Sequence, residues 1–142
     1  LWSRNLIHAF ADGTGSLEEV FKHQAQDMPK WGRGRLYNFY INGLGLNLSD
    51  VALGNIAWCS TKGNRYPDKM LRHCFSKHTA SLIDILEPDV ILLSGTATHR
   101  FAKVIRKQHP AAKVVEMLHY AHREGRDVQQ AELDRVRGLI AL

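Results

Sequence analysis

The second half of the chain alternates short apolar runs with longer segments of mixed character. Three runs have the length and composition of buried strands: 51–58, 89–94 and 113–118. Three longer segments carry apolar residues at helical spacing: 68–86, 96–108 and 127–142. Strands that alternate with helices in this way predict an α/β fold, a three-layer αβα sandwich with a central, mainly parallel sheet.

Residues near the ends of these helices set their expected limits. Glu87-Pro88 is expected to stop the helix over 68–86, because a proline and the residue before it resist helical backbone. Asp127 is expected to be the N-cap of the last helix. The inward face of 68–86 is predicted to consist of Met70, Leu71, Cys74, Phe75, Leu82, Ile83 and Leu86.

The first part of the chain predicts two helices without a strand between them. Ser16 and Glu19 are spaced as a capping box, which predicts that the segment "SLEEVFKHQAQD" is a helix. Residues 28–35 contain Pro and Gly and are expected to break it. The segment that follows predicts a second helix, which ends near Gly43 or Gly45.

Length and cysteine content add limits to this picture. The 142 residues suit a single domain over 1–142, and no repeat, low-complexity tract or linker divides them. Two cysteines do not make a disulfide framework, which favours a reducing, cytoplasmic compartment. No apolar run reaches the ~20 residues that a membrane span needs, and no signal-peptide pattern is found. We therefore expect no membrane association.

The charge is unevenly distributed along the chain. The formal net charge is +5, and residues 60–126 contain twelve Lys or Arg against six Asp or Glu. Such an excess favours a partner that carries phosphate groups, because opposite charges attract over long range. The alternative is a solvated basic face with no partner.

Three polar loops follow the predicted strands, after Trp58, Leu93 and Leu118. In parallel sheets ligands bind beyond the carboxyl ends of the strands, so we expect a site where these loops meet. The second of these loops, Ser94-Gly95-Thr96, turns directly into a helix and either holds an anion on its amides or simply joins the two elements.

The loop after Leu118 contains His119, His122 and Arg123. An imidazole at the end of a strand can donate a hydrogen bond to charge that develops on a leaving group, and His122 and Arg123 can contact phosphates. The alternative is a surface loop with two incidental histidines. The spacing fits no usual zinc site.

Four motifs occur in a fixed order along the chain. They are "N-x-x-x-C-x-x-x-x-N-R-x-P" from Asn55, a helix that carries a cysteine, "P-D-V-I-L-L-S-G-T-A", and a strand that ends in "H-Y-A-H-R". Their order and spacing resemble the uracil-DNA glycosylase superfamily, most closely its iron-sulfur branch, over roughly residues 35–125.

Carried over by position, the resemblance implies two catalytic residues and a set of DNA contacts. Asn55 matches the Asn whose amide reads the uracil edge, and an amide offers a donor and an acceptor side by side for N3–H and O4. His119 matches the residue that stabilises the departing uracil anion. The residues that would contact DNA are Asn64, Arg65, Ser94, Gly95, Thr96, Tyr120, His122 and Arg123.

The chain departs from the family pattern in its opening motif and its last motif. The motif that positions the attacking water is not found. Asp12 is the nearest candidate, unless the motif lies upstream of Leu1 or is absent, and a Gly-rich loop that feeds the first helix is the alternative for Asp12. Tyr120 and Ala121 replace the family's Pro and Ser. The aromatic residue that would stack on the base, or else belong to the core, is Trp31, Tyr37 or Phe39.

Cys59 and Cys74 match the positions of two later cluster ligands in the family. A four-iron cluster takes four thiolates, and this sequence has two cysteines. An iron-sulfur cofactor is therefore expected only if two further cysteines lie upstream of Leu1. Otherwise the pair is expected to pack as small apolar side chains.

The resemblance implies a DNA glycosylase that hydrolyses the N-glycosidic bond of uracil, or of another deaminated base, flipped out of DNA during base excision repair. Its expected partner is DNA, single-stranded DNA included, and a monomer is favoured. The alternative is a catalytically inactive relative of the same fold that binds nucleic acid or regulates a partner. A different α/β hydrolase or nucleotide-binding domain ranks last, because the sequence has no nucleophile elbow or P-loop.

Overall fold

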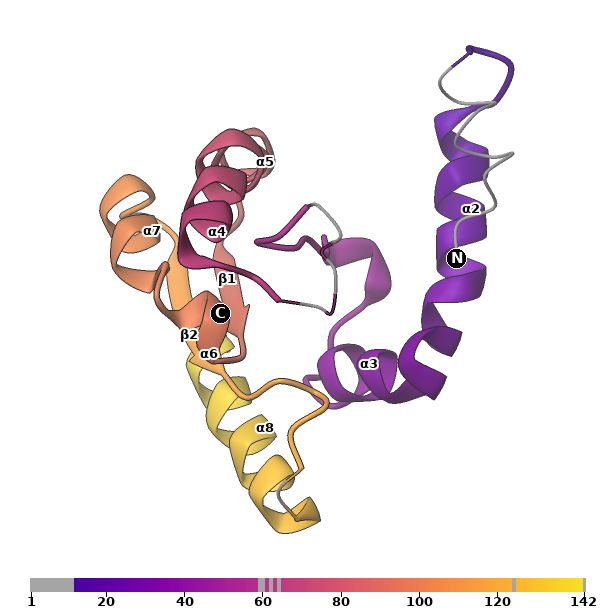
Figure 1. Cartoon of the computed structure of the whole chain (residues 1–142). Coiled ribbons are helices and arrows are strands. Elements are labelled where there is room, and N and C mark those ends of the chain that lie inside the picture. The colour runs from indigo at the N-terminus through magenta and orange to yellow at the C-terminus, as the bar shows by residue number, and fades with distance from the viewer. Residues whose placement is uncertain (1–11, 59–60, 62, 64, 124, 142) are drawn as a thin grey trace. The chain divides into compact units, whose positions relative to one another are not determined.

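The computed structural model describes residues 12–58, 61, 63, 65–123 and 125–141 (Figure 1). The chain divides into two compact units, with the boundary between Asp50 and Val51. Each unit is described by itself.

The first unit begins with the predicted capped helix. Helix α2 covers Leu17–Asp27. The Glu19 amide donates to Ser16 Oγ at 3.1 Å, and the Ser16 amide donates to Glu19 Oε2 at 3.0 Å. The capping box is confirmed, and two of the amides that a helix start leaves without partners are satisfied by it.

The predicted break and the second helix of this unit are also confirmed. The 3-10 segment η1, Met28–Gly34, contains left-handed backbone at Gly32 and Arg33 (φ 60° and 59°). Helix α3, Arg35–Tyr37, continues into the π-helical turn η2, Asn38–Asn42, and ends at Gly43, whose amide donates to Asn38 O at 2.8 Å. A short 3-10 turn, η3, follows at Leu48–Asp50. Among the described side chains of this unit, the buried apolar ones are Met28, Phe39, Ile41 and Leu44.

The second unit contains the predicted helix over 68–86 in three continuous pieces. These are α4 (Asp68–Cys74), the π-helical turn η5 (Phe75–Thr79) and α5 (Ala80–Leu86). The helix stops at Glu87 in left-handed backbone (φ 43°), as the Glu-Pro pair predicts.

The inward face of this helix is largely as predicted. Leu71, Cys74, Phe75 and Ile83 are buried, and Met70 and Leu82 are half-buried. The prediction for Leu86 is wrong, because this last residue of α5 is 46% exposed. It stands in the final turn, directly before the stop at Glu87, where the helix has run past the core.

Strands β1 (Val90–Ser94) and β2 (Lys113–Met117) pair in parallel, from Val90 opposite Lys113 to Ser94 opposite Met117. Between them lie α6 (Thr96–His99) and α7 (Ala102–Gln108), so the helix predicted over 96–108 is interrupted at Arg100 and Phe101. The fold is therefore mixed α/β with a parallel sheet.

The last helix, α8, covers Arg126–Ile140, and Gly125 is its N-cap. The prediction of Asp127 as N-cap is wrong, since Asp127 lies inside the first turn. Its carboxylate remains favourable there, because the positive end of the helix dipole lies at the N-terminus.

The strand predicted over 51–58 is not formed, and the sheet of the described residues has two strands. Ile56 and Ala57 pack against the core, but Leu53 and Trp58 are exposed. The Asn55 carbonyl accepts from Thr79 Oγ1 at 3.0 Å instead of from a neighbouring strand. Gly54 and Asn55 are residue types that strands disfavour, and they interrupt the run at its centre.

One apolar cluster joins the helices of the second unit to its sheet. Its buried members are Leu71, Phe75, Ile83, Leu93, Phe101, Ala102 and Ile105. The rings of Phe75 and Phe101 stack with centroids 4.7 Å apart, which fixes α4 and η5 against the start of α7. Burying each large side chain contributes about 1.5–3 kcal/mol, so this cluster stabilises the packing of α4 to α7 on the sheet.

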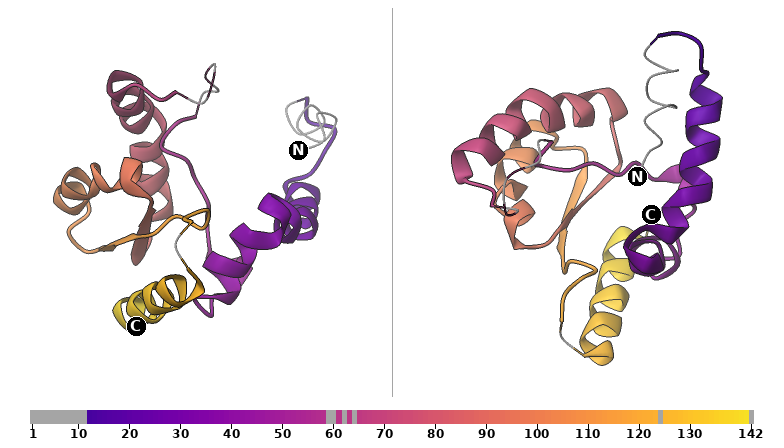
Figure 2. Two further views of the ribbon diagram at one scale, coloured as in Figure 1. Left: turned by 60° about the horizontal axis from the view of Figure 1, so that its bottom comes forward. Right: turned by 45° about the vertical axis from the view of Figure 1, so that its right-hand side comes forward.

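The outer edge of β2 is closed by side chains. The Lys113 amide donates to Asp89 O and the Gly95 amide donates to Met117 O. The backbone N–H and C=O groups of the even-numbered residues of β2 therefore point away from β1. Val114 O accepts from the Arg106 guanidinium at 3.2 Å, and Glu116 O accepts from Arg135 at 2.7 Å. Helix α8 thus contacts β2, and side chains occupy two carbonyls on the outer edge of the strand. Figure 2 shows the same ribbon from two further directions.

A search of the described residues for a helix with the length and apolar character of a bilayer span finds none.

Candidate functional site

Two of the three predicted loops meet at the carboxyl edge of β1 and β2. Ser94 Oγ donates to Leu118 O at 3.2 Å, and the Gly95 amide donates to Met117 O at 2.9 Å. The expectation that the loops after Leu93 and Leu118 converge is therefore confirmed. The third loop, after Trp58, has residues outside the described part of the chain.

Gly95 is required at this edge for two reasons. Its backbone (φ 86°, ψ 153°) lies in a region that only glycine adopts readily. A Cβ atom added at Gly95 would also lie 3.3 Å from the Cβ of His119, closer than side chains usually approach. The turn therefore lies so close to His119 that there is no room for a side chain at Gly95.

His119 is held in one tautomer by its own loop. The Ala121 amide donates to His119 Nδ1 at 3.2 Å, so the proton of the neutral ring lies on Nε2. The His122 amide donates to His119 O at 2.8 Å and closes the turn. His119 is exposed as a whole residue, but its partly covered ring has a pKa below its ordinary value, because desolvation disfavours the charged form. The ring is neutral at pH 7 and presents an Nε2–H donor.

The other predicted residues near this edge differ in their contacts. The rings of Tyr120 and His119 lie 4.4 Å apart between centroids. His122 is half-buried and its carbonyl accepts from Gln129 Nε2 at 3.0 Å, which links the loop to α8. Arg123 and Thr96 are exposed. The edge thus combines one oriented imidazole with a cationic rim.

A second histidine, His99, ties the two strands together and was not among the predicted site residues. Its Nε2 lies 3.1 Å from Leu93 O and 3.0 Å from Met117 O. Both atoms are acceptors, so Nε2 must carry the proton. Nδ1 lies 3.9 Å from the Glu116 carboxylate. The signal in the sequence is its spacing, since a residue four positions after Gly95 on a helix points back to the strand ends.

Helix α8 supplies two further residues that the sequence interpretation missed. Glu132 Oε1 accepts from the Leu118 amide at 2.9 Å, and Arg135 donates to both Glu132 and Glu116 O. The side-chain hydrogen bond from Arg135 lowers the pKa of Glu132. The spacing of a Glu and an Arg one helical turn apart is common, and nothing in it points to a strand end.

Asn55 and Arg65 are both exposed, and among the contacts of the described residues none links them to His119. The backbone of Asn55 is anchored instead: Thr79 Oγ1 donates to its carbonyl and accepts from Trp58 Nε1 at 3.0 Å. Asn64, which the sequence also predicts to contact DNA from the loop after Trp58, lies outside the described residues.

The cysteines do not form a described metal site. Cys74 is buried, at 2% exposure, and Cys59 lies outside the described residues. Within the described ranges, no group of three or more His, Cys, Asp or Glu is placed to hold a metal ion. Two cysteines in the sequence do not supply the four thiolates of a cluster.

The candidates in the first unit have local structural roles. The amide and hydroxyl of Thr14 both donate to Asp12 Oδ1, at 3.2 and 2.7 Å, and the side-chain hydrogen bond is the main cause that lowers the pKa of Asp12. Phe39 is buried and packs edge-on against Tyr40, whereas Trp31 and Tyr37 are half-buried. Asp12 thus shapes the turn before α2, and Phe39 belongs to the core.

Comparison with known proteins gives no family: no family model matches this sequence, and neither a curated protein nor a solved structure matches it.

Proposed function

We propose that this chain is a DNA glycosylase of the uracil-DNA glycosylase type, which hydrolyses the N-glycosidic bond of uracil or another deaminated base flipped out of DNA. The observation that carries the proposal is the neutral, oriented His119 at the carboxyl edge of two parallel strands, held between the Gly95 turn and Tyr120. The proposal includes the complete three-layer αβα sandwich and a reducing intracellular compartment.

The chemistry requires a donor at the departing base. When the bond between the sugar and the base breaks, its electron pair leaves with the base, and negative charge spreads to the base oxygens. A neutral imidazole with its proton on Nε2 can donate to such an oxygen without first gaining a second proton. Water then adds to the sugar carbon. For activating that water the sequence offers Asp12, unless the residue lies upstream of Leu1 or is absent.

The remaining predicted residues would hold the substrate. Asn55 would read the pairing edge of the base with its amide. Contacts with the DNA backbone are proposed for Asn64, Arg65, Ser94, Gly95 and Thr96, and entry into the DNA for Tyr120, His122 and Arg123. The proposed active species is a monomer. Cys59 and Cys74 take no part in this mechanism.

The experiment is release of uracil from a labelled oligonucleotide, detected by alkaline cleavage at the abasic site. We expect His119→Ala to lower the rate by about 10²–10³, the usual effect of removing one such donor. His73→Ala is the matched control, because His73 is exposed on α4 and outside the proposed site. Equal rates for the two variants would contradict the assignment of His119.

A second candidate function is nucleic-acid binding without base removal. The observation that favours it is the irregular segment 51–58, in which the side chain of Asn55 is exposed and not held on a strand. Binding of uracil-containing DNA without release of the base, with no effect of Asn55→Ala on affinity, would select this candidate. Release of the base by the unsubstituted chain would exclude it.

A further inference from the structure

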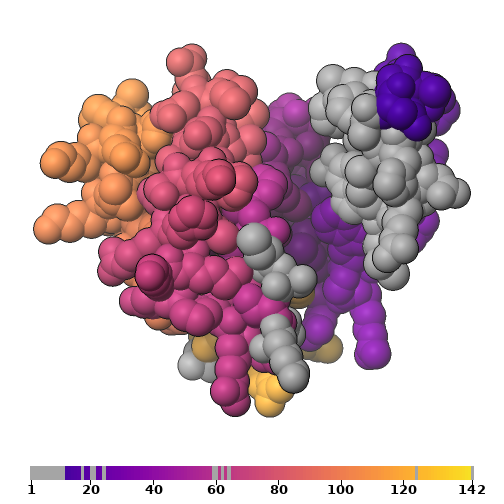
Figure 3. Space-filling view, turned by 45° about the horizontal axis from the view of Figure 1, so that its top comes forward, coloured from indigo at the N-terminus to yellow at the C-terminus, as the bar shows by residue number. Residues whose placement is uncertain are grey.

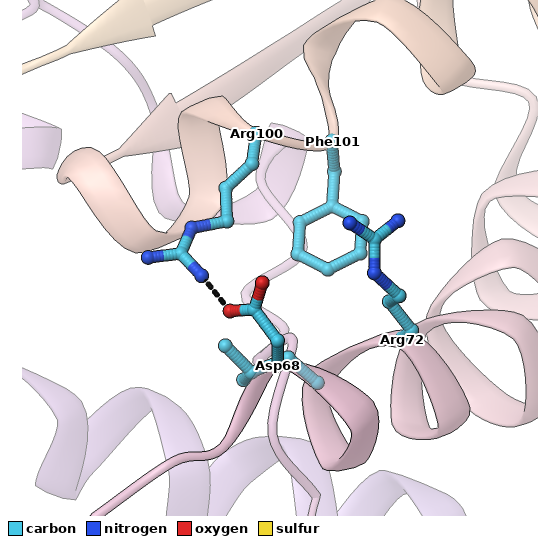
Figure 4. Close-up of a pocket in the computed structure, with 5 residues that line it drawn as sticks. Asp68, Arg72, Arg100 and Phe101 are labelled. Atoms are coloured by element: carbon cyan, nitrogen blue, oxygen red, sulfur yellow. Dashed lines mark hydrogen bonds and ion pairs between the residues drawn. The ribbon is translucent and has the colours of Figure 1, made fainter.

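A small pocket outside the candidate site is lined by two arginines. Arg72 of α4 and Arg100, between α6 and α7, surround it with Asp68, Leu71 and Phe101 (Figure 4). Its free volume is about 10 Å³, which is room for about one water molecule. The pocket cannot enclose a base or a nucleotide, so it suits only a group that is held at the surface.

Packing of the core brings the two arginines together. Arg72 follows the buried Leu71, and Arg100 precedes the buried Phe101, and both of these apolar residues belong to the same cluster. The adjacent residue on each segment therefore points to solvent. Figure 3 shows part of the surface that the second unit presents in one view, coloured from magenta to orange.

The two segments that supply the arginines carry an excess of positive charge. Residues 68–79 and 96–108 contain seven Lys or Arg (69, 72, 77, 100, 103, 106 and 107) and one acid, Asp68. That acid is paired with Arg100, and Figure 4 shows its carboxylate between the two guanidinium groups. Both partners are exposed, at 49% and 60%, and a pair of this kind is worth only about 0–1 kcal/mol.

We propose that Arg72 and Arg100 form a subsite for a backbone phosphate of nucleic acid. A guanidinium offers two parallel N–H donors that match phosphate oxygens, and two such groups around one pocket can hold one phosphate from both sides. In the absence of a phosphate the Asp68 carboxylate forms an ion pair with Arg100, and a bound phosphate would replace it. The inference rests on the proposed function only in taking DNA as the partner.

The position of the subsite fits a strand that also reaches the Gly95 turn. Helix α6 connects Gly95 to Arg100 and rises by about 6 Å over its four residues. Phosphates recur about every 3.4 Å along the axis of each DNA strand. The Gly95 turn and the subsite can therefore contact the same strand within a few nucleotides.

The test is binding of a labelled duplex that contains no uracil, measured over a range of salt concentrations. Arg72→Gln and Arg100→Gln should each lower the affinity about ten-fold, as expected when a charged hydrogen-bonding group is lost. Each should also reduce the slope of log affinity against log salt by about 1. Arg106→Gln is the control for loss of one positive charge away from the pocket, since Arg106 is 51% exposed and its guanidinium bonds Glu116 and the Val114 carbonyl of β2.

A substitution of opposite sign sharpens the test. Asp68→Asn frees Arg100 and should raise the affinity about three-fold, within the range of an exposed ion pair. Asp84→Asn makes the same change in net charge at a residue that is 68% exposed on α5, and it should leave the affinity unchanged. The subsite is rejected if the arginine variants lose no more than Arg106→Gln, if both aspartate variants bind alike, or if the duplex does not bind.

Inorganic phosphate and uracil release separate this inference from its alternatives. One outcome is that phosphate raises the melting temperature of the unsubstituted chain but not of Arg72→Gln, while both bind the duplex equally well. The site is then one for free phosphate, and the assignment to nucleic acid is wrong. If the chain releases no uracil but the two arginine variants still weaken binding of the uracil-free duplex, the proposed function fails and the subsite stands.

Discussion

The carboxyl edge of β1 and β2 and the segment 51–58 are held by different forces. At the edge, Gly95 and His99 connect the main chains of the two strands through hydrogen bonds of 2.9–3.1 Å. The segment 51–58 is held by apolar packing of Ile56 and Ala57 and by the hydroxyl of Thr79. Hydrogen bonds orient the groups that they join, whereas packing of Ile56 and Ala57 does not orient the exposed side chain of the preceding Asn55.

This difference matters because the proposed function needs both regions. His119 is oriented before any substrate arrives, but the Asn55 side chain is exposed and has to be ordered when a base binds. Fixing such a side chain costs up to about 1.5–2 kcal/mol in rotamer entropy. We therefore infer that His119 contributes to the reaction from a prepared position and that Asn55 contributes mainly on binding.

The largest expected effect comes from the turn at the carboxyl edge. Gly95→Ala places a methyl group 3.3 Å from His119 Cβ in backbone that disfavours it, and we expect a loss of about 1–3 kcal/mol in the free energy of unfolding. Gly45→Ala is the control, because Gly45 also has positive φ but open space around it. Chemical denaturation measures both. Equal losses would show that the contact with His119 contributes nothing beyond the backbone conformation.

The next effect tests the link between the strands. His99→Ala removes a donor shared by Leu93 O and Met117 O, and we expect a loss of about 1–2 kcal/mol in the free energy of unfolding. His78→Ala, at an exposed site on η5, should change it by less than about 0.5 kcal/mol. A stability change for His99→Ala as small as that of the control would mean that the Gly95 hydrogen bond alone holds the edge.

Much of the fold could be predicted from the sequence because its signals are local. Each of these signals depends on neighbouring residues. They are the capping box of Ser16 and Glu19, the helix stop at Glu87, and the apolar runs typical of strands at 89–94 and 113–118. The strand at 51–58 could be judged only in part in this way, since Gly54 and Asn55 are a local signal against it. Its formation depends on a pairing partner far along the chain, and the carbonyl of Asn55 is taken by a side chain that local pattern does not reveal.

The candidate site could be predicted only where strand ends define it. Parallel strands bring their carboxyl ends together, so Ser94, Gly95 and His119 follow from the predicted sheet. The supporting residues His99, Glu132 and Arg135 lie on helices and bond to main-chain atoms. In the sequence these three residues look like any other polar residues on a helix. Only the packing of α6 and α8 shows that they reach the strand ends.

A smaller effect should appear in the pH dependence of stability. Arg135 lowers the pKa of Glu132 in the folded chain below 4.5, so the unfolded chain binds more protons in acid. The contribution of Glu132 is therefore fully present above pH 4.5 and is lost as the pH falls through the lower, folded value. Glu132→Gln should flatten the pH dependence of the melting temperature in this window. An unchanged profile would show that the pair with Arg135 does not stabilise the edge.

The smallest effect on stability is expected at Asn55. Asn55→Ala should change the free energy of unfolding by less than about 0.5 kcal/mol, because its side chain is exposed and only its carbonyl is bonded. Thr79→Val, which removes that bond and the one from Trp58 Nε1, should cost about 1 kcal/mol. Release of uracil should show the reverse order, with Asn55→Ala the more damaging of the two. If Asn55→Ala instead lowers stability more than Thr79→Val, the Asn55 amide is already held in the folded chain. Asn55 and His119 are then both oriented before a substrate binds.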